Sequence, residues 1–440
     1  MTKRKKRKSK SPQPMSMPVL PAGSPPVRIP PPGMRRPVDI REARSTSPIV
    51  LQSMKRGETI FQLTDERPIR LHIRQHQSPG DILMLSAAVR DLHEQYPALF
   101  LTDIDTSAGA LFESSKYHTP LDRSAPGLFV IQAEYPLVHQ CNEGPWHFVQ
   151  AFHKDLETKL GLPISPTKMW GHVELSDEEK GWYSQIHEII GVDLPYWIID
   201  AGCKSDYTCK LWEVQRYQEV VNRLPELLFV QVGVTEKKIE HENGRVEYKD
   251  KGHIHIPLQG DNVINLLDKT DMRQFVRLMY HACGVITPVS FPMHLAAAVE
   301  MKDVYKRKTR PCIVIAGGRE PSQWEAYGNH QFLHTCGQLD CCDNGGCWKS
   351  RIIPLNDGEK DKDESLCLNP VEAASGQIIP KCMDMITVDE VVMHVRRYME
   401  QWNYYREWNE DDKEESTAGP GDGDPDPGSG DGDVEEGPGG

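Results

Sequence analysis

Long apolar runs are missing from this sequence of 440 residues. None approaches the roughly 20 residues that an α-helix needs to cross a bilayer, so we predict no transmembrane span. The basic start, Met1 to Lys8, is followed by Pro-rich sequence and not by the apolar core of a secretory signal. We therefore expect a cytoplasmic protein whose eleven Cys are reduced.

Net positive charge is also lacking, with 51 Lys and Arg against 64 Asp and Glu. Seven of residues 1–10 are basic, eleven Pro occupy 11–48, and 409–440 holds twelve acidic residues, one Lys and nine Gly. We expect disorder over 1–50 and 409–440. Without the two charged ends the chain keeps a net charge of −9, which argues against nucleic acid as the main partner. The basic arm is interpreted either as a nucleic-acid tether or as a solvated tail.

The middle of the chain alternates strand-like apolar runs with helical patterns, the signature of βαβ units around a parallel sheet. A first series has strands at 69–73 and 128–133 and helices at 82–96, 108–114 and 146–160. A second series has strands at 196–200, 227–232, 284–287 and 312–316 and helices at 212–224, 271–283 and 292–299. We predict two doubly wound α/β halves, at 51–190 and 191–330, with ligands at the carboxyl ends of their strands.

Asp81 follows the first strand and opens the first helix, within Gln77-Ser78-Pro79-Gly80-Asp81. One interpretation is a helix cap, because Asp is a preferred capping residue. The other is a general base that accepts the proton of an attacking hydroxyl.

The second half offers three loops at strand ends. The segment 201–212 supplies hydroxyls and the ammonium of Lys210, which is predicted to neutralise phosphate charge or, alternatively, to be a solvated Lys near a helix start. The loop 288–298 leads into a helix of small residues, where His294 is either structural or a ligand contact. Gly317-Gly318 forms a flexible loop after the last strand.

Together and in order, these blocks resemble the heptosyltransferase group of glycosyltransferases over about residues 65–330. The blocks are Gly80-Asp81-Ile82-Leu83 with Arg90 and Tyr96-Pro97, Lys210-Leu211-Trp212, Gln231-Val232-Gly233 with Glu236, Ser290 to Ala298, and Gly317-Gly318 through Trp324. The resemblance implies a GT-B fold of two Rossmann-like domains, with the acceptor in the first half and the nucleotide sugar in the second. It also implies transfer of heptose from ADP-heptose with inversion and without a catalytic metal.

The resemblance assigns roles residue by residue. Asp81 matches the base, Lys210 and Ser205 match diphosphate contacts, and Glu236 matches a ribose contact. The donor-binding loop is matched by Ser290 and His294, with Gly317 as a further substrate contact. One departure concerns the donor: Val289-Ser290-Phe291 replaces the family's Asp-Ser-Gly or Asp-Thr-Gly, so a carboxylate and a Gly are missing. ADP-heptose is therefore the leading candidate among nucleotide sugars.

Six of the eleven Cys lie between Cys336 and Cys382, in a segment at 331–385 that precedes a predicted helix at 386–408. In a reducing compartment such a cluster indicates a metal before disulfides. We choose as ligands Cys342, Cys347, Cys367 and Cys382, with Cys341 as the substitute for Cys342. Four, nineteen and fourteen residues separate these four Cys in turn, so the segment lacks a paired C-x2-C knuckle.

The Cys cluster leaves three alternatives open: a structural iron or zinc ion, a chance group of reduced thiols, and disulfides. Autotransporter-type heptosyltransferases are similar in carrying Cys-bound iron, which favours iron. For the whole chain we predict an inverting glycosyltransferase that acts on a glycan or protein hydroxyl, needs no catalytic cofactor and is able to form a homo-oligomer. The alternative is a non-catalytic nucleotide-sugar or protein-binding module on the same scaffold.

Overall fold

The computed structural model describes residues 68–401, with gaps at 139, 236, 241–245, 250–252, 303–308 and 357. It also describes two short strands before them, β1 (Val50–Gln52) and β2 (Thr59–Gln62). Contacts divide the chain into two units, 1–47 and 48–440, and all described residues belong to the second. The basic arm and the acidic tail lie outside the described residues, so their predicted disorder stays a prediction.

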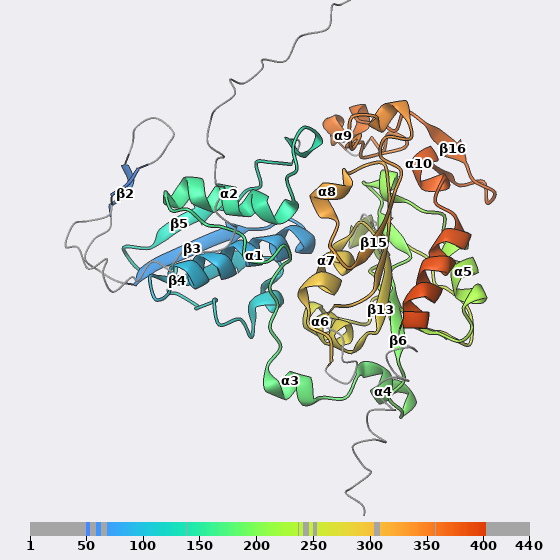
Figure 1. The fold of residues 1–440 in the computed structure, drawn as a ribbon, viewed down its shortest axis with the longest axis horizontal. Helices are drawn as coiled ribbons and strands as arrows, with labels where there is room; N and C mark the ends of the chain where they lie inside the picture. Colours follow the sequence, from blue (N-terminus) through green and yellow to red (C-terminus); the bar gives the residue numbers. More distant parts are fainter. Residues whose placement is uncertain are drawn as a thin grey trace, which may run out of the picture. The chain divides into compact units, whose positions relative to one another are not determined.

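The first sheet has three parallel strands in the order β4-β3-β5. Their bounds are β3 (Ile69–Gln75), β4 (Phe100–Thr106) and β5 (Phe129–Gln132). The connection from β3 to β4 is α1 (Pro79–Gln95), which packs against α2 (Phe148–Leu160) (Figure 1). α1 buries most of its surface, including the charged pair Arg90 and Asp91, so it is a core helix and not a surface one.

The second sheet has six parallel strands in the order β12-β8-β6-β13-β14-β15. In chain order they are β6 (Tyr196–Ile199), β8 (Leu228–Gln231), β12 (Val263–Asn265), β13 (Gly284–Pro288), β14 (Cys312–Gly317) and β15 (His330–His334). Numbered along the chain, this order is 3-2-1-4-5-6, the order of dinucleotide-binding sheets. The direction of winding reverses between β6 and β13, which is where such sheets bind ligands.

Helices cover both faces of this sheet (Figure 1). α6 (Met272–His281) and α7 (Phe291–Ala298) bury side chains in one cluster with Ile198. α5 (Val214–Arg223) and the helical residues 388–401 share another cluster with Ile199. Successive strand residues point to opposite faces, so adjacent Ile side chains reach different layers. The predicted α/β class with two Rossmann-like halves is thereby confirmed.

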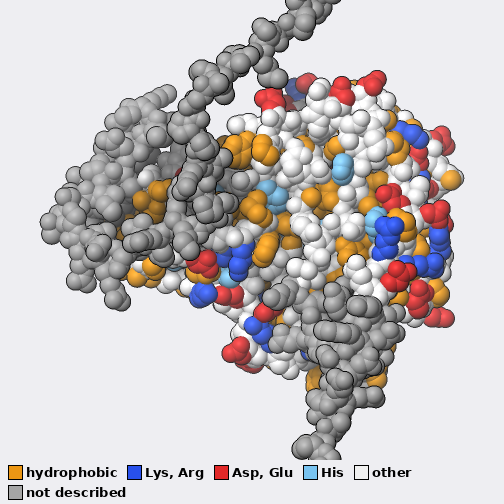
Figure 2. Space-filling model, in the orientation of Figure 1, with side chains coloured by type: hydrophobic (Ala, Val, Ile, Leu, Met, Phe, Trp, Pro, Cys, Tyr) orange, Lys and Arg blue, Asp and Glu red, His pale blue; other side chains and the backbone are white. Residues whose placement is uncertain are grey.

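Two short helices, α3 (Asp177–Gly181) and α4 (Gln185–Ile190), lie between the two sheets in the chain. Arg273 of α6 fixes this connection because it pairs with Glu179 and donates to the hydroxyl of Ser114 (2.9 Å). None of the helices in the described part of the chain has the length and apolar character that a membrane span requires. Figure 2 shows acidic and basic side chains mixed over the visible face of the described residues.

The other elements are short. β7 (Gly202–Lys204) pairs with β11 (His253–His255), and β9 (Lys237–Glu240) pairs with β10 (Val246–Lys249). The 3₁₀ turns are η1 (Gly109–Phe112), η2 (Gln140–Asn142) and η3 (Thr208–Lys210). η1 takes the place of the helix predicted at 108–114, and the predicted helix at 386–408 is helical over 388–401 within the described residues.

The Cys-rich segment folds beside the second sheet as a series of short pieces. α8 (Ser322–Glu325) precedes the segment. The pieces of the segment itself are η5 (Asp340–Cys342), α9 (Lys360–Glu364), β16 (Pro370–Glu372), β17 (Ile378–Pro380) and α10 (Lys381–Asp384). Met383 and Ile386 join the apolar cluster that α5 shares with the sheet. The segment is therefore anchored to the second half of the molecule.

Candidate functional site

Asp81 lies at the carboxyl end of the first sheet. β3 is the central strand with a neighbour on each side, so the loop after it lies at the switch point of the sheet. Ser78 precedes α1, and its backbone N–H (3.0 Å) and its hydroxyl both donate to Oδ2 of Asp81. The N-cap of α1 is therefore Ser78 and not Asp81, and Asp81 takes part in the cap as the N3 residue of a capping box.

The raised pKa of Asp81 is consistent with a role in catalysis in addition to its role in the capping box. Burial raises the pKa of Asp81, and the bonds from Ser78 and the positive charges of Lys210 and Lys204 oppose this increase. A carboxylate with a raised pKa holds an abstracted proton more firmly, so it is better suited to general-base chemistry. The candidate base of the first half therefore interacts with the candidate phosphate-binding Lys of the second half.

Lys210 lies at the end of η3 and its side chain is only 20% exposed, so it is not a solvated surface Lys. Its ammonium is 2.9 Å from Oε1 of Glu320 and donates to the carbonyl oxygen of Val289 (3.1 Å). Glu320 also pairs with Arg319. Burial and then the charge of Arg319 lower the pKa of Lys210 to about 8. Two cations thus share one buried carboxylate at the strand ends.

The switch point of the second sheet carries a hydrogen-bonded cluster around Asp200, the residue that follows β6. Its carboxylate accepts from Ser290 (2.7 Å) and Thr287 (3.1 Å) through Oδ2, and Oδ1 lies 2.9 Å from Nε2 of His255. Ser290 occupies the N-cap position of α7, but its hydroxyl donates to the Asp200 carboxylate and not to the helix. The predicted donor-loop Ser is therefore held at the place where the nucleotide is expected.

His294 is buried between α1 and α7, and its role as a donor contact stays a prediction. It is 4% exposed, and its Nδ1 is 2.6 Å from the hydroxyl of Tyr327. A Cβ on Gly80 would come within 3.1 Å of the His294 ring, so α1 and α7 approach each other closely at this point. Burial and then the charge of Lys210 lower the pKa of His294 to about 3, which keeps the ring neutral. These contacts describe a packing residue between helices.

Three other predicted site residues have different surroundings. Ser205 is half-buried in the turn between β7 and η3. Glu236 lies outside the described residues. Gly317 has a φ of +65°, and a Cβ there would come within 2.5 Å of the Met383 sulfur, so the position requires Gly for packing. Its neighbours belong to the Cys-rich segment, and the role of Gly317 as a substrate contact stays a prediction.

Glu325, the last residue of α8, was not singled out from the sequence. The residue is 6% exposed, and within the described residues its Oε2, like the Oε2 of Glu320, has no hydrogen-bond partner. The charged groups acting on it are Lys210, Arg319 and Asp81. It lies two residues before Tyr327 in a stretch without a recognisable motif, so no sequence signal singles it out.

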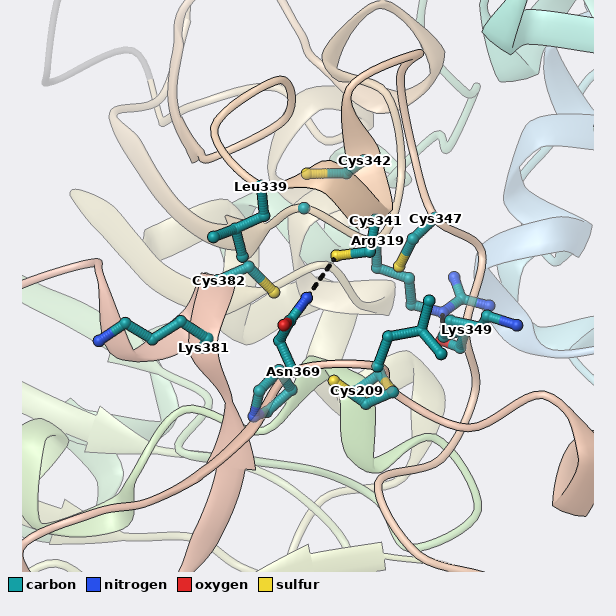
Figure 3. Close-up of a pocket in the computed structure, with 14 residues that line it drawn as sticks. Cys209, Arg319, Leu339, Cys341, Cys342, Cys347, Lys349, Asn369, Lys381 and Cys382 are labelled. Carbon is teal, nitrogen blue, oxygen red and sulfur yellow. Dashed lines mark hydrogen bonds between the residues drawn. The ribbon is translucent and has the colours of Figure 1, made fainter. Parts of the chain in front are cut away.

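Six Cys residues line one small cavity at the base of the Cys-rich segment (Figure 3). They include all five predicted metal ligands, Cys341, Cys342, Cys347, Cys367 and Cys382, and one residue that the sequence did not indicate, Cys209. All eleven Cys are free thiols, so the structure has none of the disulfides considered as an alternative. Thiols from segments far apart in sequence therefore converge on one place.

The two adjacent Cys of η5 point in different directions. In Figure 3 the sulfurs of Cys341, Cys347 and Cys382 face the middle of the cavity, whereas that of Cys342 turns away. The Cys342 thiol donates to the carbonyl oxygen of Thr335 (3.5 Å), and Asn369 donates to the Cys341 sulfur (3.3 Å). Cys341 is thus better placed as a ligand than Cys342.

Cys209 supplies a thiol hydrogen bond to Cys367, which lowers the pKa of Cys367 to about 7. Thiolates are the ligand form of Cys for zinc and iron. Within the described residues, however, no three Cys, His, Asp or Glu side chains are already arranged to hold a metal ion. The sulfur atoms would have to draw together around one.

Residues 136–333 match the model of glycosyltransferase family 9 (heptosyltransferase). This segment contains Lys210, Ser290 and Glu325 but not Asp81. The match confirms the predicted resemblance to the heptosyltransferase group. No curated protein matches the chain.

Three solved structures are similar to this chain. ADP-heptose LPS heptosyltransferase II of E. coli is 14% identical, with 76% of this chain and 99% of that chain covered and a TM-score of 0.43. A family 9 glycosyl transferase from Veillonella parvula is 12% identical, with 76% and 97% covered and a TM-score of 0.46. The iron-containing dodecameric glycosyltransferase TibC from enterotoxigenic E. coli is 15% identical, with 78% of each chain covered and a TM-score of 0.49.

Proposed function

Starting from a family 9 glycosyltransferase (heptosyltransferase) segment at residues 136–333, we propose that this protein transfers a sugar from a nucleotide-sugar donor to a hydroxyl group of a glycan or protein. Heptose is the proposed sugar and ADP-heptose the leading donor. The single observation that carries the proposal is the close approach of α1 to α7, where a Cβ on Gly80 would come within 3.1 Å of the His294 ring, because it brings Asp81 to the predicted donor loop.

In the proposed reaction the acceptor oxygen attacks the anomeric carbon of the donor. A new glycosidic C–O bond forms, the bond from the anomeric carbon to the diphosphate oxygen breaks, and ADP leaves. The acceptor proton passes to the Asp81 carboxylate. A single displacement of this kind inverts the anomeric configuration, as the resemblance implies.

Lys210 has the second role. Charge builds on the diphosphate as it leaves, and a buried ammonium stabilises that charge more strongly than one in water does. The diphosphate must compete with the Glu320 carboxylate, whose Oε1 is 2.9 Å from the ammonium. Arg319 adds positive charge to the same place.

A second candidate function is a nucleotide-sugar-binding module without catalysis. It is favoured by the donor loop, where Val289-Ser290-Phe291 carries no carboxylate. Incubation with a panel of nucleotide sugars separates the two. Release of nucleoside diphosphate, fastest with ADP-heptose, is the result expected of the enzyme. A binder would show a rise in melting temperature without release.

The Cys cavity is proposed as a structural site for iron or zinc. Cys341, Cys347, Cys367 and Cys382 supply four thiolates, enough for a closed tetrahedral site. The ion would tie η5, β16 and α10 together beside β14, and it takes no part in sugar transfer. Cytoplasmic location and self-association belong to the same proposal and rest on the sequence.

A further inference from the structure

Trp348 has a backbone conformation that is unfavourable for its side chain. Its φ is +55°, in the left-handed region that a bulky residue rarely adopts. Such a conformation costs free energy and persists only where the surrounding contacts enforce it, often at active sites and ligand clamps. Trp348 directly follows Cys347, one of the predicted metal ligands. The contacts that hold Trp348 therefore indicate what its conformation serves.

Within the second half of the molecule, Trp348 is held against Arg319, which follows β14. The backbone N–H of Trp348 donates to the carbonyl oxygen of Arg319 (2.9 Å), and Nε of Arg319 donates to the carbonyl oxygen of Lys349 (2.8 Å). The Arg319 guanidinium lies 5.7 Å from the centroid of the Trp348 ring and 5.1 Å from that of the Tyr207 ring. Two aromatic rings thus restrict the orientation of one buried cation.

Arg319 lies next to the proposed diphosphate contact. The charged groups of Arg319 and Lys210 pair with the same atom, Oε1 of Glu320, so they are neighbours at the strand ends. A guanidinium binds phosphate through two parallel N–H groups, so its orientation decides how well it binds. The position of Trp348 therefore affects the groups that would hold the donor.

Trp348 also contacts the first half of the molecule. Its indole N–H donates to Oδ1 of Asn142 (2.6 Å), and Nδ2 of Asn142 donates to the carbonyl oxygen of Gly346 (2.8 Å). Asn142 is the last residue of η2, in the chain between β5 and α2. One amide group thus bonds the residues on both sides of Cys347. The Cys-rich segment is joined to both halves through Trp348.

We propose that Trp348 is a positioning residue for sugar transfer, which orients Arg319 toward the donor diphosphate and fixes the first half at the donor site through Asn142. This inference rests on the proposed function. Asp81, the proposed base, belongs to the half that Asn142 joins. The two roles use different atoms of one side chain, because the ring face contacts the guanidinium and the indole N–H contacts the amide. Phe keeps the first contact and loses the second, whereas Leu loses both.

The first measurement is the affinity of the full-length protein for ADP. Calorimetry on Trp348→Leu should show a loss of about 3- to 30-fold, the range of a cation–π contact that is shielded from water. Trp348→Phe should stay within about twofold of the wild type, because its ring still faces the guanidinium. A merely structural Trp348 would lower stability without this difference between Phe and Leu.

The second measurement is the rate of label transfer from saturating labelled ADP-heptose to a cell extract. Trp348→Phe and Asn142→Ala should each lower it about 3- to 30-fold, as expected when one partner of a hydrogen bond is removed. The double variant should be no slower than Asn142→Ala alone, because the two residues share one bond. Trp170→Phe, at a Trp that is 41% exposed, is the control and should change neither measurement by more than about twofold.

Several results would overturn the inference. Unchanged ADP affinity in Trp348→Leu would separate Trp348 from the donor site, and unchanged transfer in Trp348→Phe would remove the role of its bond to Asn142. A double variant much slower than Asn142→Ala would show that the two residues act independently, and a variant that unfolds would make Trp348 structural. Failure of the wild type to release ADP from ADP-heptose would instead contradict the proposed function, and the ADP measurements would still test the orientation of Arg319.

Discussion

At the scale of single residues, Asp81 combines two properties that the sequence presented as alternatives. It closes the capping box of α1 through Ser78, and it interacts electrostatically with Lys210. A helix cap fixes the side chain in one rotamer, which is what a general base requires. The two interpretations are therefore compatible, and a substitution has to separate them.

Asp81→Asn keeps a side-chain oxygen for the cap but cannot take up a proton at neutral pH. We predict that sugar transfer falls about 10²- to 10⁴-fold, the typical contribution of a general base. Affinity for ADP should be nearly unchanged, because the base acts on the acceptor. Steady-state kinetics and calorimetry check this. A variant that keeps more than about half of its turnover would restrict Asp81 to the cap.

Lys210 leads to a pH-dependent prediction. Burial lowers its pKa to about 8, so the ammonium is charged below this pH and becomes neutral as the pH rises through it. A diphosphate binds the charged form. Affinity for ADP should therefore fall above about pH 8, by up to about tenfold per pH unit.

The matched variant is Lys210→Arg, because Arg stays charged throughout this range. Calorimetry between pH 7 and pH 9.5 should show the fall in the wild type and not in the Arg variant. Lys210→Ala should bind ADP weakly at every pH. The same pH dependence in all three proteins would remove Lys210 from the diphosphate site.

Sequence reasoning located residues that follow strands but not those whose partners are distant in the chain. Asp81, Lys210 and Ser290 each lie shortly after a predicted strand, and parallel strands end at one edge. Glu325 and Cys209 became visible only in the structure, since their partners are more than 100 residues away in the chain or carry no local pattern. Such contacts depend on tertiary packing.

At the scale of elements, the buried strands were the most predictable. β6, β8, β13 and β14 are largely apolar runs, typical of parallel sheets covered on both faces, whereas β3 alternates apolar and polar residues from Ile69 on. β12 was missed because three residues are too few to show a period, and β15 was missed because three of its five side chains are polar. The helix predicted at 108–114 shortened to η1, since Gly109 weakens a helix at its start.

Gly317, at the end of β14, is tested by comparison with Gly328. Gly317→Ala meets the Met383 sulfur and an unfavourable φ of +65°, whereas a Cβ on Gly328 has nothing within 4 Å. We predict that Gly317→Ala lowers the free energy of unfolding by about 1 to 3 kcal/mol. Gly328→Ala should change it by less than about 0.5 kcal/mol. Chemical denaturation measures both, and equal effects would contradict the packing role.

In the Cys-rich segment, the adjacent residues Cys341 and Cys342 of η5 allow a comparison of two substitutions. About one iron or zinc ion per chain should be found by elemental analysis after purification without added metal. Cys341→Ser should lower the metal content and the melting temperature, while Cys342→Ser should keep the metal, since its sulfur faces away from the cavity. Metal-free protein with eleven titratable thiols in denaturant would contradict the site.

At the scale of the whole molecule, the proposed active site combines residues inside the family segment with Asp81, which lies outside it. The family segment, 136–333, contains the second sheet up to β15 and most groups that face the donor. Asp81 lies outside it, on a sheet of only three described strands. The family segment therefore holds the proposed donor side of the reaction, and the proposed base of the acceptor side comes from the chain before it.

The central claim is that this protein moves heptose, and label transfer tests it most directly. ADP-heptose labelled in the sugar is incubated with the wild-type protein and a cell extract as the source of acceptor. We predict that label enters macromolecular material with release of ADP, and that neither occurs with Asp81→Asn or Lys210→Ala. If the wild type binds ADP-heptose but releases no ADP and transfers no label, the protein is a binding module and the account is wrong.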